Sequence, residues 1–587
     1  MIKLKNNHLY DDRASQIVSW GHWFTLFNIL FVIVIGSQYL MIADWPATLL
    51  GRIYAIMSVI GHFSFLAFIV YLIFLFPLSF FVHSIKFQRT VAVIVATVAI
   101  VLLLLDIEIF SRFRMHLNFS LWQILMSSDD NIFNAQWQKI FIFIPAVLLV
   151  QIIFAIWSWR KLRSLTKRRR YCKPVVIVLV LCFLSSHFIH IWADAHFYRP
   201  ITMQRSSLPV SYPMTAKHFL EKYGFLQPTS YQQQIEKEGD PFAMAIEYPL
   251  GRIQYAPINR PMNILMIIVD DWYIDEKQSA TPKLDALAQH HLQFLNHYAS
   301  SNNHYLNEFS LFYGLDPNYY NSILATHKSS LLIDIATKQH YSLGLFATDG
   351  FAHSLYRYAL LSNFSIPDAA EQSIDQVTEN WSNWFDDKIA LDVPAHWLSI
   401  IKYAHNQDID ENNRLALSDR MKSVDNAIDR VLTKLQQAHQ LDNTVVVITA
   451  NNKLPQQHSS DKLRYSRDAL RMPLIVVWPD KNAEQFTKNT SHVSIMQTLM
   501  QNALNVTSPA ENYSQGENLF MNHQPKWLIA GSEKEIAALY SDHTIVVDSF
   551  GHYQIFDANN QLQEDRQLGL STFLQLITEN RRFMVVN

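Results

Sequence analysis

Long apolar runs fill the first third of the chain, whereas polar and apolar residues are mixed through the remainder. Each run reaches the roughly 20 residues that an α-helix needs to cross the hydrocarbon core of a bilayer. The pattern therefore predicts five membrane-spanning helices, at about 19–42, 53–82, 90–110, 138–159 and 174–193. The second span is long enough either to tilt or to break at Pro77.

Two acidic residues, Asp106 and Glu108, lie near the end of the third span. One interpretation is that they have reached the membrane surface beside Arg112 and Arg114, and the other is that they form a buried polar site. We expect the surface position, because a charged side chain inside the hydrocarbon core is costly.

Basic residues cluster between the fourth and fifth spans, and no acidic residue accompanies them. They are Arg160, Lys161, Arg163, Lys167, Arg168, Arg169, Arg170 and Lys173. Because cytoplasmic loops carry an excess of Lys and Arg, this loop predicts a cytoplasmic N-terminus and an external position for everything after about residue 193. The loop with Lys86 and Arg89 agrees, and a nucleic-acid-binding patch is disfavoured between two spans.

The composition changes after the fifth span. The whole chain is 50% hydrophobic and 17% charged with a net charge of −2, but these values average two unlike parts. We expect a transmembrane domain at 1–194, an interfacial connector and linker at 195–260, and a soluble domain at 261–587. The cysteines, Cys172 and Cys182, both precede the soluble domain, which therefore has no disulfide.

The soluble part alternates strand patterns with helix patterns. Near-continuous apolar runs predict strands at 262–271, 340–350, 443–451 and 472–479, and helical periodicity predicts helices at 281–295, 329–339 and 414–440. This alternation is typical of an α/β domain with helices on both faces of the sheet. Ligand chemistry is then expected at the strand carboxyl ends, which hold Asp270, Asp349 and Asn451.

These strand ends resemble the alkaline phosphatase/sulfatase superfamily. A strand ending in Asp270, an SSNN loop before a helix, a TDG strand end, VVVITA and MPL occur in the expected order, followed by HVSIMQTLMQNAL and YSQGENLF. Together with the five spans, FYRPITMQR, SYPMTAKHFLEKYG, SWGHWFTLFNIL, IADWP and IGHFSFL resemble the YejM/PbgA family of Gram-negative inner-membrane proteins. The resemblance covers nearly the full length. It implies a periplasmic α/β domain of alkaline phosphatase/sulfatase-like type.

The superfamily transfers phosphoryl or sulfuryl groups, using divalent cations held by Asp and His and a Thr, Ser or modified Cys nucleophile. Asp270 matches the first metal-ligand Asp, but His304 and Tyr305 stand where the nucleophile is expected. The nearest serines are Ser300, Ser301 and Ser310.

The remaining ligands implied by the resemblance are also replaced. Asn451 and Asn452 stand in place of an Asp-His pair. The segment before MPL, where a His is implied, offers Arg467, Ala469 and, displaced from it, His458. One carboxylate, or two with Asp271, is too few to offset the dehydration of a hard divalent cation. We therefore expect a catalytically inactive domain without a metal or cofactor, in which Asp270 is a structural acid.

The resemblance implies a regulator rather than a metabolic enzyme. The family is understood to sense lipopolysaccharide on the periplasmic leaflet and to restrain the membrane adaptor LapB. LapB promotes destruction of LpxC, the lipid A biosynthetic deacetylase, by the protease FtsH. The family is also linked to cardiolipin. The implied partners are thus lipid A, anionic phospholipid and a LapB-type adaptor, and the basic loop Arg160–Lys173 either contacts that adaptor or only sets the topology.

The connector offers chemistry that suits a lipid phosphate. A helix starting at Thr215 and ending near Gly224 would present free amides, because His218 stands where a capping box would place Glu or Gln. The residues assigned to lipid binding are Arg199, Arg205, Thr215, Ala216, Lys217, His218 and Phe219. The aromatic side chains expected near acyl chains are Trp192, Phe197, Tyr198 and Phe219.

Family members are expected to carry two arginines at positions 217 and 218. Lys217 lacks the bidentate fork of Arg, and His218 titrates near neutral pH, so we expect weaker or more pH-sensitive lipid A binding. The alternative is an ordinary interfacial helix whose basic side chains reach anionic lipids.

Two other functions stay open at the level of sequence. One is a metal-dependent phosphoglycerol or phosphoethanolamine transferase or phosphatase, because such enzymes also join five spans to this domain. The other is a cardiolipin carrier. The first needs an intact Thr nucleophile and metal ligands, which the strand-end motifs lack.

Overall fold

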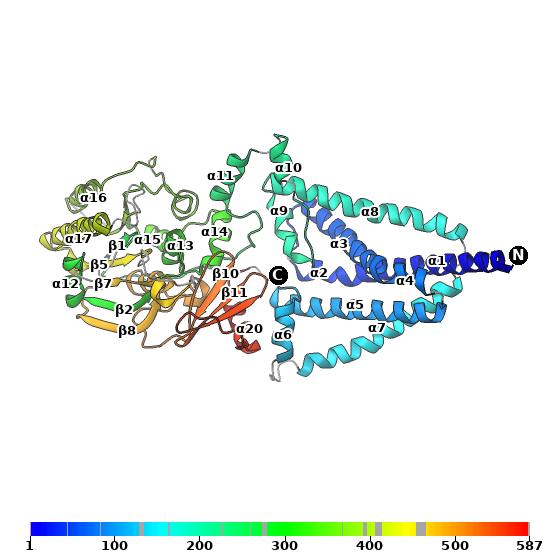
Figure 1. The fold of residues 1–587 in the computed structure, drawn as a ribbon. Helices are drawn as coiled ribbons and strands as arrows, with labels where there is room; N and C mark the ends of the chain where they lie inside the picture. Colours follow the sequence, from blue (N-terminus) through cyan, green and yellow to red (C-terminus); the bar gives the residue numbers. More distant parts are fainter. Residues whose placement is uncertain are drawn as a thin grey trace.

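The computed structural model describes residues 2–43, 45–82, 84–127, 134–161, 165–215, 217–224, 227–258, 260–272, 279–366, 368–390, 396–404, 414–453 and 465–584. Within these ranges, the side-chain surroundings of residues 2–15, 113, 125–127, 134–141, 160–161, 165–172, 217–218, 221, 228–230, 232 and 414 are not described. A bundle of long helices and a mixed α/β body lie end to end (Figure 1).

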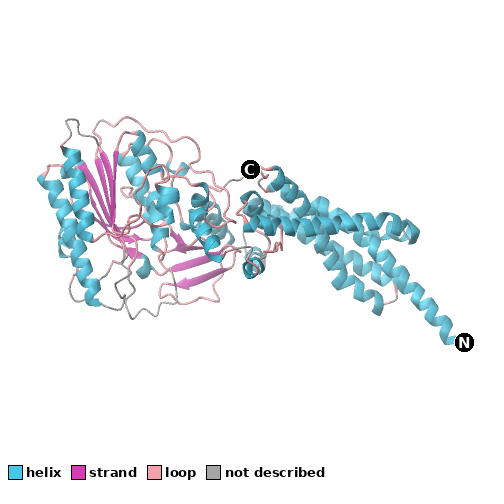
Figure 2. Ribbon diagram, turned by 90° about the horizontal axis from the view of Figure 1, so that it is seen from above, coloured by secondary structure: helices cyan, strands magenta, loops and turns pink. Residues whose placement is uncertain are grey.

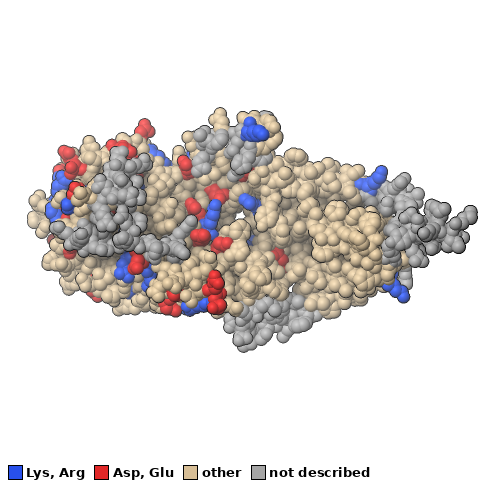
Figure 3. Space-filling model, in the orientation of Figure 1, with Lys and Arg blue, Asp and Glu red and all other residues tan. Residues whose placement is uncertain are grey.

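The helical body contains the predicted spans. Its helices are α1 (Ile2–Gly36), α2 (Gln38–Ile42), α3 (Leu49–Val70), α4 (Phe76–Phe81), α5 (Ile85–Phe113), α6 (Phe119–Ser127), α7 (Asn134–Lys161) and α8 (Leu165–Ala195). Among the described residues, five stretches are long and apolar enough to cross a membrane: Gln16–Ile42, Leu49–Phe81, Ile85–Arg112, Ile142–Trp159 and Lys173–Ala195. The prediction of five spans is confirmed. On the face drawn in Figure 3, the charged residues gather on the α/β body and at the far end of the helices.

The second span continues through Pro77 but is not a regular α-helix there. A π-helical turn, η1 (Tyr71–Leu75), precedes α4, and Pro77 lies in the first turn of α4. Proline has no amide hydrogen, and its ring clashes with the carbonyl group four residues earlier. The regular hydrogen-bond ladder therefore cannot pass through this position, and the wider turn absorbs the mismatch.

The loop predicted between the fourth and fifth spans is largely helical. α7 continues to Lys161 and α8 begins at Leu165, so most of the basic run, and Cys172 with it, lies on helix ends. The loop prediction is wrong because Lys and Arg are good helix formers, and a helix can continue beyond its apolar stretch.

Asp106 lies in a buried polar site, so the expectation of a surface position is wrong for this residue. It is 6% exposed. Its Oδ1 accepts a hydrogen bond from the Leu117 amide at 2.5 Å, and its Oδ2 accepts one from the Tyr39 hydroxyl and lies 2.8 Å from Nδ1 of His116. These partners offset the cost of burying the acid. The side chain of Glu108 is partly exposed and forms an ion pair with Arg112.

The α/β body is built on one large sheet. Its strands are β1 (Asn263–Val269), β2 (Leu292–Tyr298), β3 (Ser342–Ala347), β4 (Trp397–Tyr403), β5 (Thr444–Ala450), β6 (Arg471–Met472), β7 (Leu474–Val477) and β8 (Glu484–Ser491). The order is β3-β4-β1-β5-β7-β2-β6, with β8 beside β2. Because β3, β4, β1 and β5 are parallel neighbours, their carboxyl ends meet at one edge.

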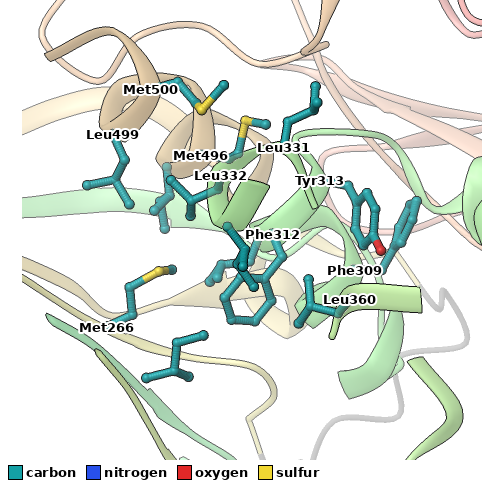
Figure 4. Packing of buried hydrophobic residues seen from close by; sticks show 14 of the residues in the cluster. Met266, Phe309, Phe312, Tyr313, Leu331, Leu332, Leu360, Met496, Leu499 and Met500 are labelled. Carbon is teal, nitrogen blue, oxygen red and sulfur yellow. The ribbon is translucent and has the colours of Figure 1, made fainter. Parts of the chain in front are cut away.

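Helices cover both faces of this sheet (Figure 2). Alternate residues of β1 pack on opposite faces of the sheet, because successive side chains of a strand point in opposite directions. Leu265 and Ile267 pack into the cluster formed with α12 (Pro282–His290), α16 (Ile374–Ile389) and α17 (Arg414–Gln437). Met266 and Ile268 pack into the cluster formed with α13 (His304–Tyr313), α14 (Tyr320–Thr326), α15 (Leu331–Lys338) and α19 (His492–Thr498). Figure 4 shows part of this second cluster.

The predicted α/β class is confirmed, and all four predicted strands are present as β1, β3, β5 and β7. The structure also has elements that were not expected. Residues 292–295, predicted as the end of a helix, begin β2, because Leu292 and Phe294 are buried with strand periodicity. The predicted connector and linker, 195–260, contains the helix α11 (Pro228–Glu238).

A second, antiparallel sheet lies where the α/β body faces the helices. Its strands are β9 (Leu528–Gly531), β10 (Glu535–Leu539), β11 (His543–Asp548) and β12 (Tyr553–Asp557), and α20 (Leu570–Glu579) packs on it. Met115 and Leu121, at the corner between α5 and α6, join the same apolar cluster as Ile545 of β11 and Phe573 of α20. The corner is therefore packed into the core of the soluble body.

Candidate functional site

Charged and polar side chains from several elements meet at the carboxyl edge of the large sheet. Asp270 follows β1, Asp349 follows β3, Lys402 is the last but one residue of β4, and Asn451 follows β5. Glu308 joins them from α13, which covers this side of the sheet. The three strand-end positions expected from the sequence are thus brought together, and two further residues complete the cluster.

Lys402 lies at the centre of this strand-end cluster. Its Nζ is 2.8 Å from Oε1 of Glu308, 3.0 Å from Oδ2 of Asp349 and 3.9 Å from Oδ2 of Asp270. The side chains of Lys402 and Glu308 are 1% and 0% exposed. The rings of Tyr305 and Tyr356 lie 5.5 and 5.1 Å from the ammonium. Three carboxylates and two aromatic rings therefore surround one buried cation.

Two asparagines stand where the resemblance implied an Asp-His pair. Nδ2 of Asn451 donates to Oδ1 of Asp270 and to Oε1 of Glu308, both at 2.7 Å. Nδ2 of Asn452 donates to Oδ1 of Asp271 at 2.7 Å, and the Asp271 amide donates back to Oδ1 of Asn452 at 2.8 Å. The amides thus act as hydrogen-bond donors to the strand-end acids.

Burial and charge set the protonation states in the cluster. Burial raises the pKa of Glu308 to about 7, with Lys402 opposing and Asp270 adding to the shift. Burial alone would lower the pKa of Lys402, but the carboxylates of Glu308, Asp270 and Asp349 outweigh it and raise that pKa above its ordinary value. Lys402 is therefore a permanent cation at neutral pH.

The start of α13 carries the aromatic residues His304 and Tyr305 in place of a Thr, Ser or Cys nucleophile. Asn303 caps the helix by accepting a hydrogen bond from the Tyr305 amide at 2.9 Å. The Tyr305 ring stacks on His353, with ring centroids 3.2 Å apart. Burial, aided by Lys402, lowers the pKa of His353 to about 3, so this imidazole is neutral. The nearby serines are all buried: Ser300, Ser301 and Ser310.

The residues present do not fit the divalent cation that the superfamily resemblance implies. A hard cation needs several oxygen ligands at roughly 2.0–2.6 Å. Here the carboxylates hydrogen-bond an ammonium that occupies the space between them. Among the described residues, no group of three or more His, Cys, Asp or Glu is arranged to hold a metal. Arg467 donates to the Tyr540 carbonyl group, and His458 lies outside the described residues.

The connector, residues 195–224, joins the helical body to the α/β body. Nη2 of Arg199, in α9 (Arg199–Thr202), donates to the Ala243 carbonyl at 2.8 Å, and the Thr202 hydroxyl donates to the Pro241 carbonyl at 2.6 Å. Burial lowers the pKa of Arg199, which Asp240 opposes. Arg199, predicted as a lipid contact, is therefore engaged with the soluble side.

The other predicted lipid residues are spread along the connector. Arg205 is exposed with its guanidinium 4.7 Å from the Phe242 ring, and Thr215 and Phe219 are exposed. Helix α10 (Lys217–Lys222) contains Lys217 and His218, and Ala216 lies outside the described residues. Trp192 is exposed and Tyr198 is half-buried. Phe197 cannot meet an acyl chain, because it is 7% exposed and packs on the ring of Tyr231.

Three histidines of the helical body hold the connector in place. Nε2 of His62 lies 2.7 Å from the Pro209 carbonyl oxygen, and Nδ1 of His190 lies 3.2 Å from the Met214 carbonyl oxygen. The Met214 amide donates to Nδ1 of His187 at 3.2 Å. These anchors were not predicted from the sequence, although histidines about one turn apart near the end of an apolar stretch are a visible signal.

Five large apolar side chains of the connector are exposed, and together they are called the apolar strip here. It consists of Val210, Tyr212, Met214, Phe219 and Tyr223, and Tyr212 is 74% exposed. The strip lies on the same connector as Arg205 and Lys222, both exposed. The connector therefore exposes both apolar and basic side chains.

The sequence is similar over nearly its full length to known membrane proteins. The inner membrane protein YejM of Salmonella typhimurium is 42% identical over 580 residues, which are 98% of this chain and 98% of that protein. The chain belongs to the YejM family. An uncharacterized protein of Haemophilus influenzae is 36% identical over 573 residues, 96% of each chain. The family named Domain of unknown function (DUF3413) matches residues 6–255, and Sulfatase matches residues 262–506.

The soluble body is thus a sulfatase-type domain joined to a membrane domain. Among solved structures, a protein in the alkaline phosphatase superfamily from Vibrio parahaemolyticus has a TM-score of 0.45 at 13% identity, covering 58% of this chain and 90% of that one. Phosphonate monoester hydrolase SpPMH from Silicibacter pomeroyi has a TM-score of 0.41 at 15% identity, covering 55% and 94%.

Proposed function

We propose that this chain is a lipid-responsive regulator of the bacterial inner membrane with a sulfatase-type domain that does not turn over a substrate. In this proposal the connector binds lipid A of lipopolysaccharide at the periplasmic leaflet. The bound state is passed to a LapB-type adaptor, which governs destruction of LpxC by FtsH and hence lipid A synthesis. The N-terminus is then cytoplasmic and the α/β body periplasmic.

The observation that carries the proposal is that the connector is bonded to both bodies. His62 and His190 hold it from the helices, while Arg199 and Thr202 hold the 241–243 loop of the soluble side. A ligand that shifts the connector must therefore change its contacts with both bodies. This is the requirement for coupling between a binding site and a distant surface.

The chemistry of the connector suits a phosphorylated lipid. The exposed apolar strip provides surface for acyl chains, and Arg205 provides a guanidinium for phosphate. An arginine can donate two parallel hydrogen bonds to one phosphate, which favours a phosphate monoester over a more diffuse charge.

A transferase or phosphatase function is disfavoured by the strand-end cluster. His304 and Tyr305 occupy the helix start where a hydroxyl nucleophile is needed, and Lys402 fills the space between the carboxylates. The ammonium of Lys402 is already paired with carboxylates, so it offers no free positive charge to an anionic ester. If the strand-end cluster does not catalyse a reaction, the connector is still free to bind a lipid.

The proposal is tested with the full chain in nanodiscs. Binding of lipid A is compared with binding of vesicles that contain cardiolipin or phosphatidylglycerol, for the wild type and for Arg205→Ala. Lys422→Ala on α17 is the matched control, because it removes an exposed basic residue far from the connector. We expect Arg205→Ala alone to weaken lipid A binding by about tenfold, the equivalent of about 1.4 kcal/mol.

Three outcomes contradict the proposal. Equal affinity for lipid A and for the anionic vesicles would reduce the connector to an interfacial segment. Tight binding of cardiolipin alone would favour a carrier. Turnover of a phosphate or sulfate ester by the purified chain would favour an enzyme.

A further inference from the structure

The strand-end cluster contains its own cation. We infer that the ammonium of Lys402 permanently takes the place of a divalent cation, so that the carboxylates around it form a metal-type site that is closed from within. The inference deepens the proposed function, on which it rests, because it gives a physical reason for a domain without metal-dependent turnover.

The strand register places the lysine and the acids on one face. Lys402 pairs with Ile268 of β1 and with Ala347 of β3. Asp270 and Asp349 each come two residues after these partners, and strand side chains repeat their direction every two residues. The lysine therefore lies between two strands whose ends both supply a carboxylate to the same side of the sheet.

The helix on that side closes the cage. Glu308 of α13 reaches the ammonium at 2.8 Å, and Asn451 links Glu308 to Asp270 by donating to both acids at 2.7 Å. Three carboxylates, after β1, after β3 and on α13, thus face one point, although with the lysine in place no three acids of the described residues are arranged to hold a metal. The point is occupied by Nζ of Lys402, which hydrogen-bonds two of them and lies 3.9 Å from the third.

A divalent ion and this ammonium exclude each other. The oxygen atoms that would bind the ion at roughly 2.0–2.6 Å already lie at hydrogen-bond distance from Nζ. Withdrawing the lysine is also opposed by charge, since a buried acid left without its cation is strongly destabilising. The site therefore keeps its positive charge whatever the metal supply, whereas a smaller neutral side chain at 402 would leave both space and ligands for an ion.

The experiment loads the full chain, in detergent or nanodiscs, with Mn²⁺ and measures bound metal by electron paramagnetic resonance and elemental analysis. Lys402→Ala removes the cation and opens space, whereas Lys402→Met removes the cation but fills the space. We expect no stoichiometric Mn²⁺ on the wild type or on Lys402→Met, and one Mn²⁺ per chain on Lys402→Ala. We also expect Mn²⁺ to raise the unfolding temperature of Lys402→Ala alone.

Two results overturn the inference: stoichiometric Mn²⁺ on the wild type that is lost in Asp270→Asn, or a Lys402→Ala chain that gains neither Mn²⁺ nor stabilisation by it. If Lys402→Ala does not fold, Lys402→Ala/Glu308→Gln balances the charge and is held to the same criterion. Mn²⁺ on the wild type without ester turnover would overturn this inference only. Mn²⁺ with turnover would also overturn the proposed function.

Discussion

The buried carboxyl group of Glu308 should make the stability of the soluble body depend on pH. Its pKa is raised from 4.5 to about 7 in the folded chain, mainly by burial. Between these values the unfolded chain has lost the proton that the folded chain keeps, so stability falls as pH rises through this window. Each pKa unit corresponds to about 1.4 kcal/mol, so the whole window lowers the free energy of unfolding by about 3 kcal/mol.

The substitution Glu308→Gln isolates this effect. Glutamine keeps the shape but does not titrate, so the difference in unfolding free energy between wild type and variant should change by about 3 kcal/mol from pH 4.5 to pH 8. The two proteins must be compared because His353 and His492 also titrate. Burial lowers their pKa values to about 3 and about 4, which makes stability rise with pH in both proteins.

The assay is urea unfolding of the full chain in detergent at a series of pH values, followed by tryptophan fluorescence. Trp397 in β4 and Trp381 in α16, which packs on the sheet, are both buried and report its opening. Asp316→Asn is a second variant for the same assay. Burial also raises the pKa of Asp316 to about 7, so this variant should remove a separate loss of stability with rising pH. A wild-type minus Glu308→Gln difference that stays constant with pH would refute the reasoning.

Other predictions concern the connector and the corner. Asp106→Ala should lower the free energy of unfolding by about 3 kcal/mol, because buried donors lose a charged acceptor, and hydrogen exchange at the Leu117 amide should accelerate. Gly551→Ala should loosen the corner, because Gly551 has φ of +85° and the new Cβ would lie 2.7 Å from Cε of Met115; limited proteolysis near the corner measures this. Lipid A should bind more tightly at pH 6 than at pH 8 if His218 titrates, and equal affinity would contradict that role.

The sequence was sufficient for the parts of the structure that depend on local pattern. Long apolar runs identified the five spans, and apolar runs that end in acids identified the strands before Asp270 and Asp349. Because neighbouring parallel strands share one edge, the meeting of those residues with Asn451 also followed.

The centre of the site did not follow, because it depends on pairing between distant segments. Strand β4 was missed, and with it Lys402, since a lysine in WLSIIKY reads as an interruption. Glu308 reads as a solvated helix residue until α13 is placed on the sheet. The sequence does contain one indication of the cluster. A lysine inside an otherwise apolar strand must be paired with acidic side chains if it is buried.

The buried position of Asp106 was not predicted for the same reason, because it depends on partners that are distant in the sequence. Those partners also connect Asp106 to the connector. Asp106 binds His116, whose Nε2 lies 3.1 Å from the Ser206 carbonyl oxygen of the connector. Two residues further along the corner, Asn118 donates to the Phe550 carbonyl group of the soluble body. The connector therefore meets the α/β body by two routes, through Arg199 and through this corner. In the proposed function, a ligand that displaces the connector would change the contacts on both routes, and its binding energy would reach the soluble body without a reaction at the strand ends.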